Sequence, residues 1–111
     1  MSKVYAPQVP SKYDVATKLW LPSINLEPAK SFGEIVVMLP PNANRLHINP
    51  LIVALREQMK DFTEDDYVVA VGDPSLIAAA SCIAVRKTGG LLRILKWDRQ
   101  TSAYIPVEVN V

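Results

Sequence analysis

The segment VVAVGDPSL, residues 68–76, combines residue types that can hold a phosphate at the start of a helix. An apolar stretch runs into Gly72, Asp73 and Ser75, and backbone N–H groups at a helix N-terminus attract anions. The segment lacks the second glycine and the lysine of a phosphate-binding loop, and Asp73 puts negative charge where a phosphate needs positive charge. Asp73 followed by Pro74 is typical of a plain helix cap. Both interpretations predict that a helix begins here.

Catalytic groups are sparse in the rest of the chain. His47 and Cys82 are the only histidine and cysteine, and a zinc site needs more ligands than this pair supplies. Cys82 stands in an apolar run, where a thiol usually packs as a small buried hydrophobe. The carboxylates are not gathered at the ends of the predicted strands, as a hard cation would require. The sequence therefore predicts no catalytic site, no metal site and no cofactor, and indicates a protein that is not an enzyme.

Strands and helices alternate over residues 33–111. Branched apolar runs predict the strands, and apolar residues at steps of three and four predict the helices. Asn49 and Pro50 repeat the cap and proline pattern of Asp73 and Pro74. The predicted elements are strands at residues 34–39, 67–71, 91–97 and 103–109, a helix that opens at Asn49 and Pro50, and a helix from Asp73 to Gly89.

This alternation predicts an α/β fold with a small βαβαβ parallel core that contains two helices. Pro106 cannot donate a ladder hydrogen bond, so residues 103–109 are expected to form a C-terminal antiparallel edge strand. Residues 33–111 are expected to make a single α/β domain.

Residues 1–32 are expected to form an extended, proline-rich N-terminal arm. Four prolines in this stretch leave no room for a helix of useful length. Large apolar residues are too frequent for a solvated linker, so the arm must pack against something. We expect a short strand near residues 18–24 that crosses the open face of the sheet. The alternative is packing against a partner subunit, as in a homodimer.

If the strands are parallel, the loops that follow them meet at one edge, where open α/β sheets bind ligands. This edge would collect residues from three loops. The candidate ligand-binding residues, for a nucleotide or phosphate, are Asn42, Gly72, Asp73, Ser75 and Arg99.

Basic and aromatic residues alternate in RILKWDR, residues 93–99. This pattern is compatible with protein or nucleic-acid contacts, and also with a solvated hairpin. The candidate partner-binding residues are Trp20, Arg93, Lys96, Trp97, Arg99 and Tyr104.

The overall charge produces no general electrostatic attraction to nucleic acid or to an anionic membrane, because twelve basic and eleven acidic residues leave a formal net charge of +1. The N-terminus lacks a signal-peptide core, and no apolar run reaches membrane-spanning length. These features predict a soluble, cytoplasmic protein.

Three stretches, LEPAKSFGEIVVMLPP, VGDPSLIAAA and GGLLRILKWDRQTSAYIPVEV, resemble short proteins of unassigned function that tailed bacteriophages encode. The resemblance implies expression in the cytoplasm of a bacterial host and an accessory role, and it assigns no role to any residue. With the absent catalytic groups, it favours a non-enzymatic accessory or regulatory protein that binds a protein or nucleic acid of phage or host. The alternatives are a nucleotide- or phosphate-binding domain and a minor virion component.

Overall fold

A five-stranded sheet with the order β4-β1-β5-β6-β7 organises the fold in this computed structural model, which describes residues 2–44 and 46–111. β4, β1, β5 and β6 are parallel, and β7 is antiparallel to β6 at the sheet edge. The mixed α/β class, the mostly parallel sheet and the antiparallel C-terminal strand confirm the prediction. The strands are β1 (Lys3–Gln8), β4 (Glu34–Leu39), β5 (Tyr67–Val69), β6 (Leu91–Asp98) and β7 (Ala103–Asn110).

The interior strand β1 comes from the segment that the sequence assigned to an extended arm. β1 pairs with β4 on one side and with β5 on the other, so β4 and β5 are not neighbours as the prediction placed them. Pro7 is tolerated in β1 because it is paired with neither neighbour, so its missing N–H breaks no ladder hydrogen bond. The pairing with β5 ends at Tyr5, and the pairing with β4 skips from Ala6 to Gln8. The parallel core is therefore built around the first residues of the chain.

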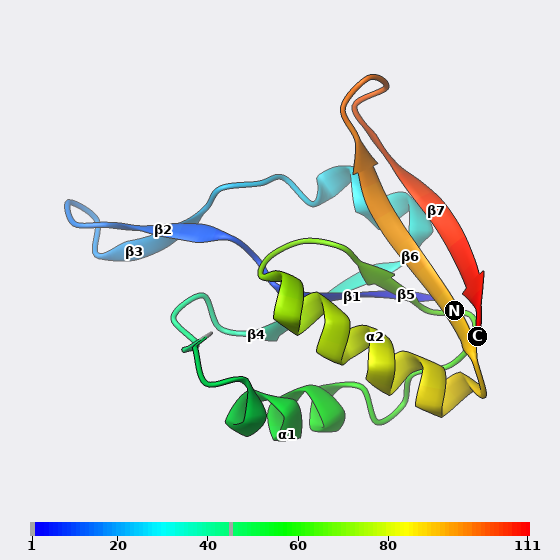
Figure 1. Ribbon diagram of the computed structural model, residues 1–111. Coiled ribbons are helices and arrows are strands. Elements are labelled where there is room, and N and C mark those ends of the chain that lie inside the picture. The colour runs from blue at the N-terminus through cyan, green and yellow to red at the C-terminus, as the bar shows by residue number, and fades with distance from the viewer. Residues whose placement is uncertain (1, 45) are drawn as a thin grey trace.

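Helices α1 (Ile48–Gln58) and α2 (Pro74–Thr88) lie on one side of the sheet (Figure 1). α2 has the predicted ends: the Asp73 side chain accepts a hydrogen bond from the Ser75 backbone N–H, and Gly89 caps the C-terminus with a φ of 75°. Both ends are therefore determined locally by the sequence.

The predicted N-cap of α1 at Asn49 is wrong, because the helix starts at Ile48 and its N-cap is His47. Asn49 and Pro50 are the second and third helical residues. The N–H groups of the first turn have no intrahelical acceptor, so Pro50 fits there without the loss of a hydrogen bond.

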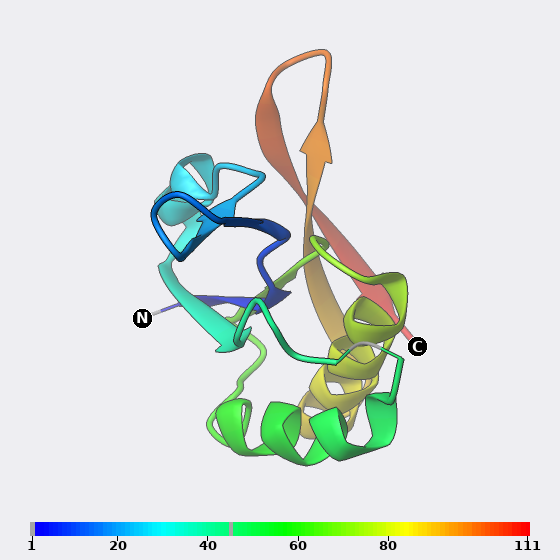
Figure 2. The same cartoon turned by 90° about the vertical axis from the view of Figure 1, so that its left-hand side faces the viewer.

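Alternate residues of the strands form two apolar cores. Tyr5, Val68 and Leu92 pack toward the helices, in a cluster with Leu55 and Leu76. The neighbouring residues Val4, Val69 and Leu95 point to the other face, which the 3₁₀ helix η1 (Glu27–Phe32) covers. Figure 2 shows η1 and the two α-helices on opposite sides of the sheet.

The strand predicted at residues 18–24 does not cross this sheet. Instead β2 (Ser11–Asp14) and β3 (Leu19–Pro22) form a separate two-stranded hairpin. A connection of four residues closes this antiparallel pair at low entropic cost, and η1 already occupies the face that the strand would have covered. The hairpin projects to one side of the sheet (Figure 1).

The connection from β5 to α2 passes very close to the end of β1 at Gly72. Its φ is 96°, and a Cβ built there would lie 2.6 Å from the Gln8 carbonyl oxygen. The buried Gln8 side chain donates a hydrogen bond from Nε2 to the Pro40 carbonyl oxygen, 2.8 Å away. Gln8 and Gly72 thus tie the carboxyl ends of β4, β1 and β5 together.

Replacing Gly72 with alanine should lower the free energy of unfolding by about 1–3 kcal/mol, because the new methyl group meets backbone in a strained conformation. Urea denaturation measures the loss. Gly89→Ala is the matched control, since Gly89 also has positive φ but a methyl group on it would meet no atom within 4 Å. An equal or smaller loss for Gly72→Ala than for Gly89→Ala would contradict the close approach.

Candidate protein-binding surface

Strands β6 and β7 form a ribbon that extends past β5, and the face of this ribbon turned away from the helices carries paired side chains. Trp97 and Tyr104 lie opposite each other with ring centroids 5.0 Å apart, in an edge-to-face arrangement. Leu95 and Pro106 form the next pair on this face, and Arg93 and Glu108 the one after it. Trp97 is 42% exposed, whereas Tyr104 is 6% exposed. The ribbon therefore presents one large aromatic side chain to solvent.

A pocket of about 330 Å³ lies between this face and the segment around η1. Desolvation of the buried Tyr104 side chain raises the pKa of its hydroxyl. Among the residues that the structure describes, no charged side chain lines the pocket, so it suits an apolar group. The pocket is lined by Ile24, Asn25, Pro28, Val71, Trp97 and Tyr104.

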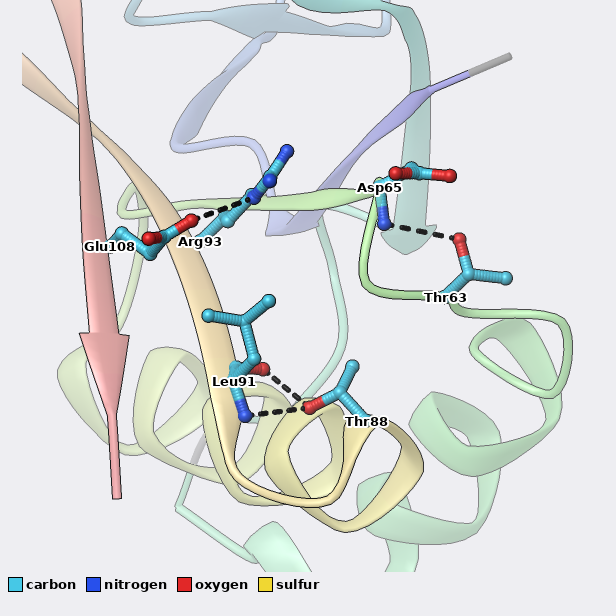
Figure 3. A network of polar contacts seen from close by, with 6 residues as sticks. All are labelled: Thr63, Asp65, Thr88, Leu91, Arg93 and Glu108. Atoms are coloured by element: carbon cyan, nitrogen blue, oxygen red, sulfur yellow. Dashed lines mark hydrogen bonds and ion pairs between the residues drawn. The ribbon is translucent and has the colours of Figure 1, made fainter.

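The basic residues predicted to accompany Trp97 are divided among different places. Arg93 donates from Nε to Glu108 Oε1 at 3.2 Å, and its guanidinium carbon lies 6.0 Å from the centre of the Tyr67 ring. Figure 3 shows this pairing across the two strands. Lys96 pairs with Ile105 on the opposite face, and Arg99 lies in the turn at the tip of the ribbon. The structure thus brings together Trp97 and Tyr104 from the predicted set, without a basic cluster around them.

Trp20 belongs to a second exposed surface, which we call the apolar hairpin, residues 11–22. The Trp20 and Tyr13 rings meet edge to face with centroids 5.5 Å apart. Large apolar side chains are exposed on both faces of this hairpin. They are Tyr13 (49% exposed), Val15 (79%), Leu19 (59%), Trp20 (41%) and Leu21 (47%).

The apolar hairpin leads directly into the 330 Å³ pocket beside Trp97 and Tyr104, which we call the aromatic pocket. The Ser23 N–H donates to the Pro10 carbonyl oxygen at 2.7 Å and closes the base of the hairpin. Ile24 and Asn25 follow immediately and form one wall of the pocket. Sequence reasoning missed Ile24, Asn25, Pro28 and Val71, because only the path of the chain over the sheet brings these four residues to Trp97.

The predicted ligand-binding residues lie in three places: Gly72, Asp73 and Ser75 at the start of α2, Asn42 beside a cavity, and Arg99 in the turn at the tip of the β6–β7 ribbon. Asp73 accepts hydrogen bonds from the backbone and the hydroxyl of Ser75, so its carboxylate already occupies the start of α2. Asn42 lines a cavity of about 240 Å³ with Trp20 and Gln8. The turn between β6 and β7, which carries Arg99, projects away from the start of α2 (Figures 1 and 2).

Residues 2–44 and 46–111 contain neither a metal centre nor a membrane-spanning helix. Within these ranges, no group of three or more histidine, cysteine or acidic side chains is placed to hold a metal ion. None of the helices in the same ranges is both long and apolar enough to span a bilayer.

The tip of the β6–β7 ribbon is held by Asp98. The Thr101 hydroxyl donates to Asp98 Oδ2 at 2.6 Å, and this hydrogen bond is the main cause that lowers the pKa of Asp98; the backbone N–H groups of Gln100 and Thr101 add to the effect. Because the pKa is lower in the folded turn than in the unfolded chain, the contact stabilises the turn at neutral pH. This contribution is lost as the pH falls through the folded pKa.

Thr101→Val should therefore raise the pKa of Asp98 toward the value of an unstructured carboxyl group. An NMR titration of the side-chain carboxyl carbons measures it. Asp14 is the internal control, because its pKa is lowered chiefly by the Thr17 hydroxyl in the other hairpin and should not move. An unchanged Asp98 pKa in the variant would refute the assigned cause.

The sequence matches along almost its whole length to one family of bacteriophage proteins. No curated protein and no solved structure matches it. The family profile covers residues 2–111, including the apolar hairpin, the aromatic pocket and both helices. The resemblance of the sequence to short phage proteins is thereby confirmed, and the chain belongs to the family described as Phage Pam3 gp32-like protein.

Proposed function

We propose that this phage protein is a protein-binding module that docks on its partner through the apolar hairpin. The observation that carries the proposal is the exposure of five large apolar side chains on a hairpin that belongs to a separate sheet. A two-stranded hairpin is only marginally stable by itself in water, and contiguous exposed apolar surface usually marks an interaction site. A partner that covers the hairpin would remove this surface from water and order it.

The aromatic pocket extends the proposed docking surface. Ile24 connects the end of β3 to Trp97 and Tyr104, so the hairpin and the pocket form one continuous apolar path. Trp and Tyr carry a large share of binding energy in protein interfaces. An apolar side chain of the partner would enter the pocket while the hairpin lies along the partner's surface.

At the proposed docking surface, the charges favour a protein partner over a nucleic acid. Binding to a phosphate backbone needs several unengaged basic side chains along one surface. Here Arg93 pairs with Glu108, Lys96 lies on the far face of the ribbon, and Arg99 is at its tip. The Asp73 carboxylate at the start of α2 likewise disfavours a bound phosphate. The proposed role is therefore accessory or regulatory, through protein contacts inside the infected host and without a catalytic step.

Trp20→Ala should reduce capture of the partner about 30-fold, the loss expected when a buried interface tryptophan worth about 2 kcal/mol is removed. The tagged full-length chain is used to capture proteins from an extract of infected host cells, and captured proteins are quantified by mass spectrometry. An untagged copy of the same chain is added to the extract, so that self-association is detected as capture of the untagged chain.

Ile105→Ala is the matched control, because Ile105 is similarly exposed, at 38%, but lies on the opposite face of the β6–β7 ribbon. Both variants should unfold at the same urea concentration as the parent chain. The proposal fails if Trp20→Ala captures the same proteins with the same yield as Ile105→Ala. It also fails if nuclease treatment abolishes all capture.

A further inference from the structure

Residues of helices α1 and α2 line a groove of about 520 Å³. These helices and η1, which borders the aromatic pocket, lie on opposite sides of the sheet (Figure 2). Ile52 from α1 and Ala79 and Ile83 from α2 form its apolar floor. This volume falls within the roughly 300–1,000 Å³ that is usual for ligand sites. The groove has no part in the hairpin docking proposed above, so it requires a separate explanation.

The rim of the groove is cationic. Arg56 from α1 and Arg86 and Lys87 from α2 line it, and none of the carboxylates in residues 2–44 and 46–111 does. In the part of the chain that the structure describes, the ion pairs join Glu27 with Lys30, Glu57 with Lys60, and Arg93 with Glu108. The cations at the rim take part in none of these pairs, although Lys87 donates from Nζ to the Lys60 carbonyl oxygen at 2.9 Å.

The groove requires an occupant that is apolar at its centre and acidic at its edges. A β-strand cannot add to this surface by backbone pairing, because the backbone groups of α1 and α2 are used within the helices. A helix can lie in the groove between two others and insert apolar side chains at steps of three and four. Carboxylates that flank those side chains would then meet the arginines, for which bidentate pairing is favourable.

We propose that the α1–α2 groove binds an acidic amphipathic helix of a partner protein. Charge complementarity selects this occupant over a basic or a neutral helix. With the apolar hairpin on another side of the molecule, the chain would hold two proteins at once.

Cys82 makes the groove directly measurable. It is the single cysteine of the chain and it lines the groove between Ala79 and Arg86. The structure exposes its side chain, contrary to the prediction from the sequence, because one edge of α2 faces the groove and is not covered by the sheet. An occupant of the groove should therefore slow alkylation of Cys82 by iodoacetamide.

The test uses two designed helical peptides with the same leucine face, one flanked by glutamates and the other by lysines. The full-length chain should bind the glutamate peptide about tenfold or more tightly than the lysine peptide by fluorescence anisotropy, and only the glutamate peptide should protect Cys82. High salt should weaken this binding, because the rim charges are solvent-exposed. The double variant Arg56→Glu, Arg86→Glu should reverse the preference.

The double variant Lys96→Glu, Arg99→Glu is the matched control. It changes the net charge by the same amount on the β6–β7 ribbon, and it should leave the preference for the glutamate peptide intact. Trp20→Ala should also bind the glutamate peptide normally, which separates this proposal from hairpin docking. Equal binding of both peptides, or an unchanged preference in Arg56→Glu, Arg86→Glu, would overturn the proposal. Protection of Cys82 by phosphatidylglycerol vesicles but not by the glutamate peptide would overturn it in favour of a lipid surface.

Discussion

The pairing of β1 with both β4 and β5 is the constraint on which the rest of this structure depends. β1 lies between β4 and β5 and joins them into one sheet. Val4 and Ala6 of β1 have no solvent exposure. Both ends of β1 are tied. At the start, the buried Asp66 carboxylate accepts hydrogen bonds from the Lys3 and Thr63 backbone N–H groups, each at 2.8 Å. At the end, Gln8 holds the Pro40 carbonyl oxygen.

The fixed end of β1 also determines where the two proposed binding surfaces lie. β2 begins three residues after Gln8, so the apolar hairpin leaves the sheet at the edge where Gln8 meets Gly72. The alternation of side chains along the strands then separates two faces. The face that η1 covers carries Trp97 and Tyr104, and the other face carries the helix pair with its cationic groove. A single sheet thereby presents two surfaces of different chemistry.

The parts of the fold that the sequence predicted are those with local causes. Asp73, Pro74 and Gly89 fix both ends of α2 through contacts within a few residues, and the apolar runs at β4 and β6 are strands at almost the predicted positions. β1 was missed because its partners, Glu34 through Leu39 and Tyr67 and Val68, are distant in the sequence. Pro7 also argued against a central strand. Likewise, Trp97 and Trp20 were recognisable by residue type, but the pocket wall formed by Ile24 and Asn25 depends on the path of the chain over the sheet.

Hydrogen exchange of the backbone amides, followed by NMR in the chain without a partner, tests the central place of β1 most directly. The hydrogen-bonded amides of β1 should exchange only through global unfolding, whereas those of the apolar hairpin should exchange orders of magnitude faster by local opening. Exchange from β1 as fast as from residues 11–22 would contradict this, because the first strand would then be a loosely attached arm and could not hold β4 and β5 together.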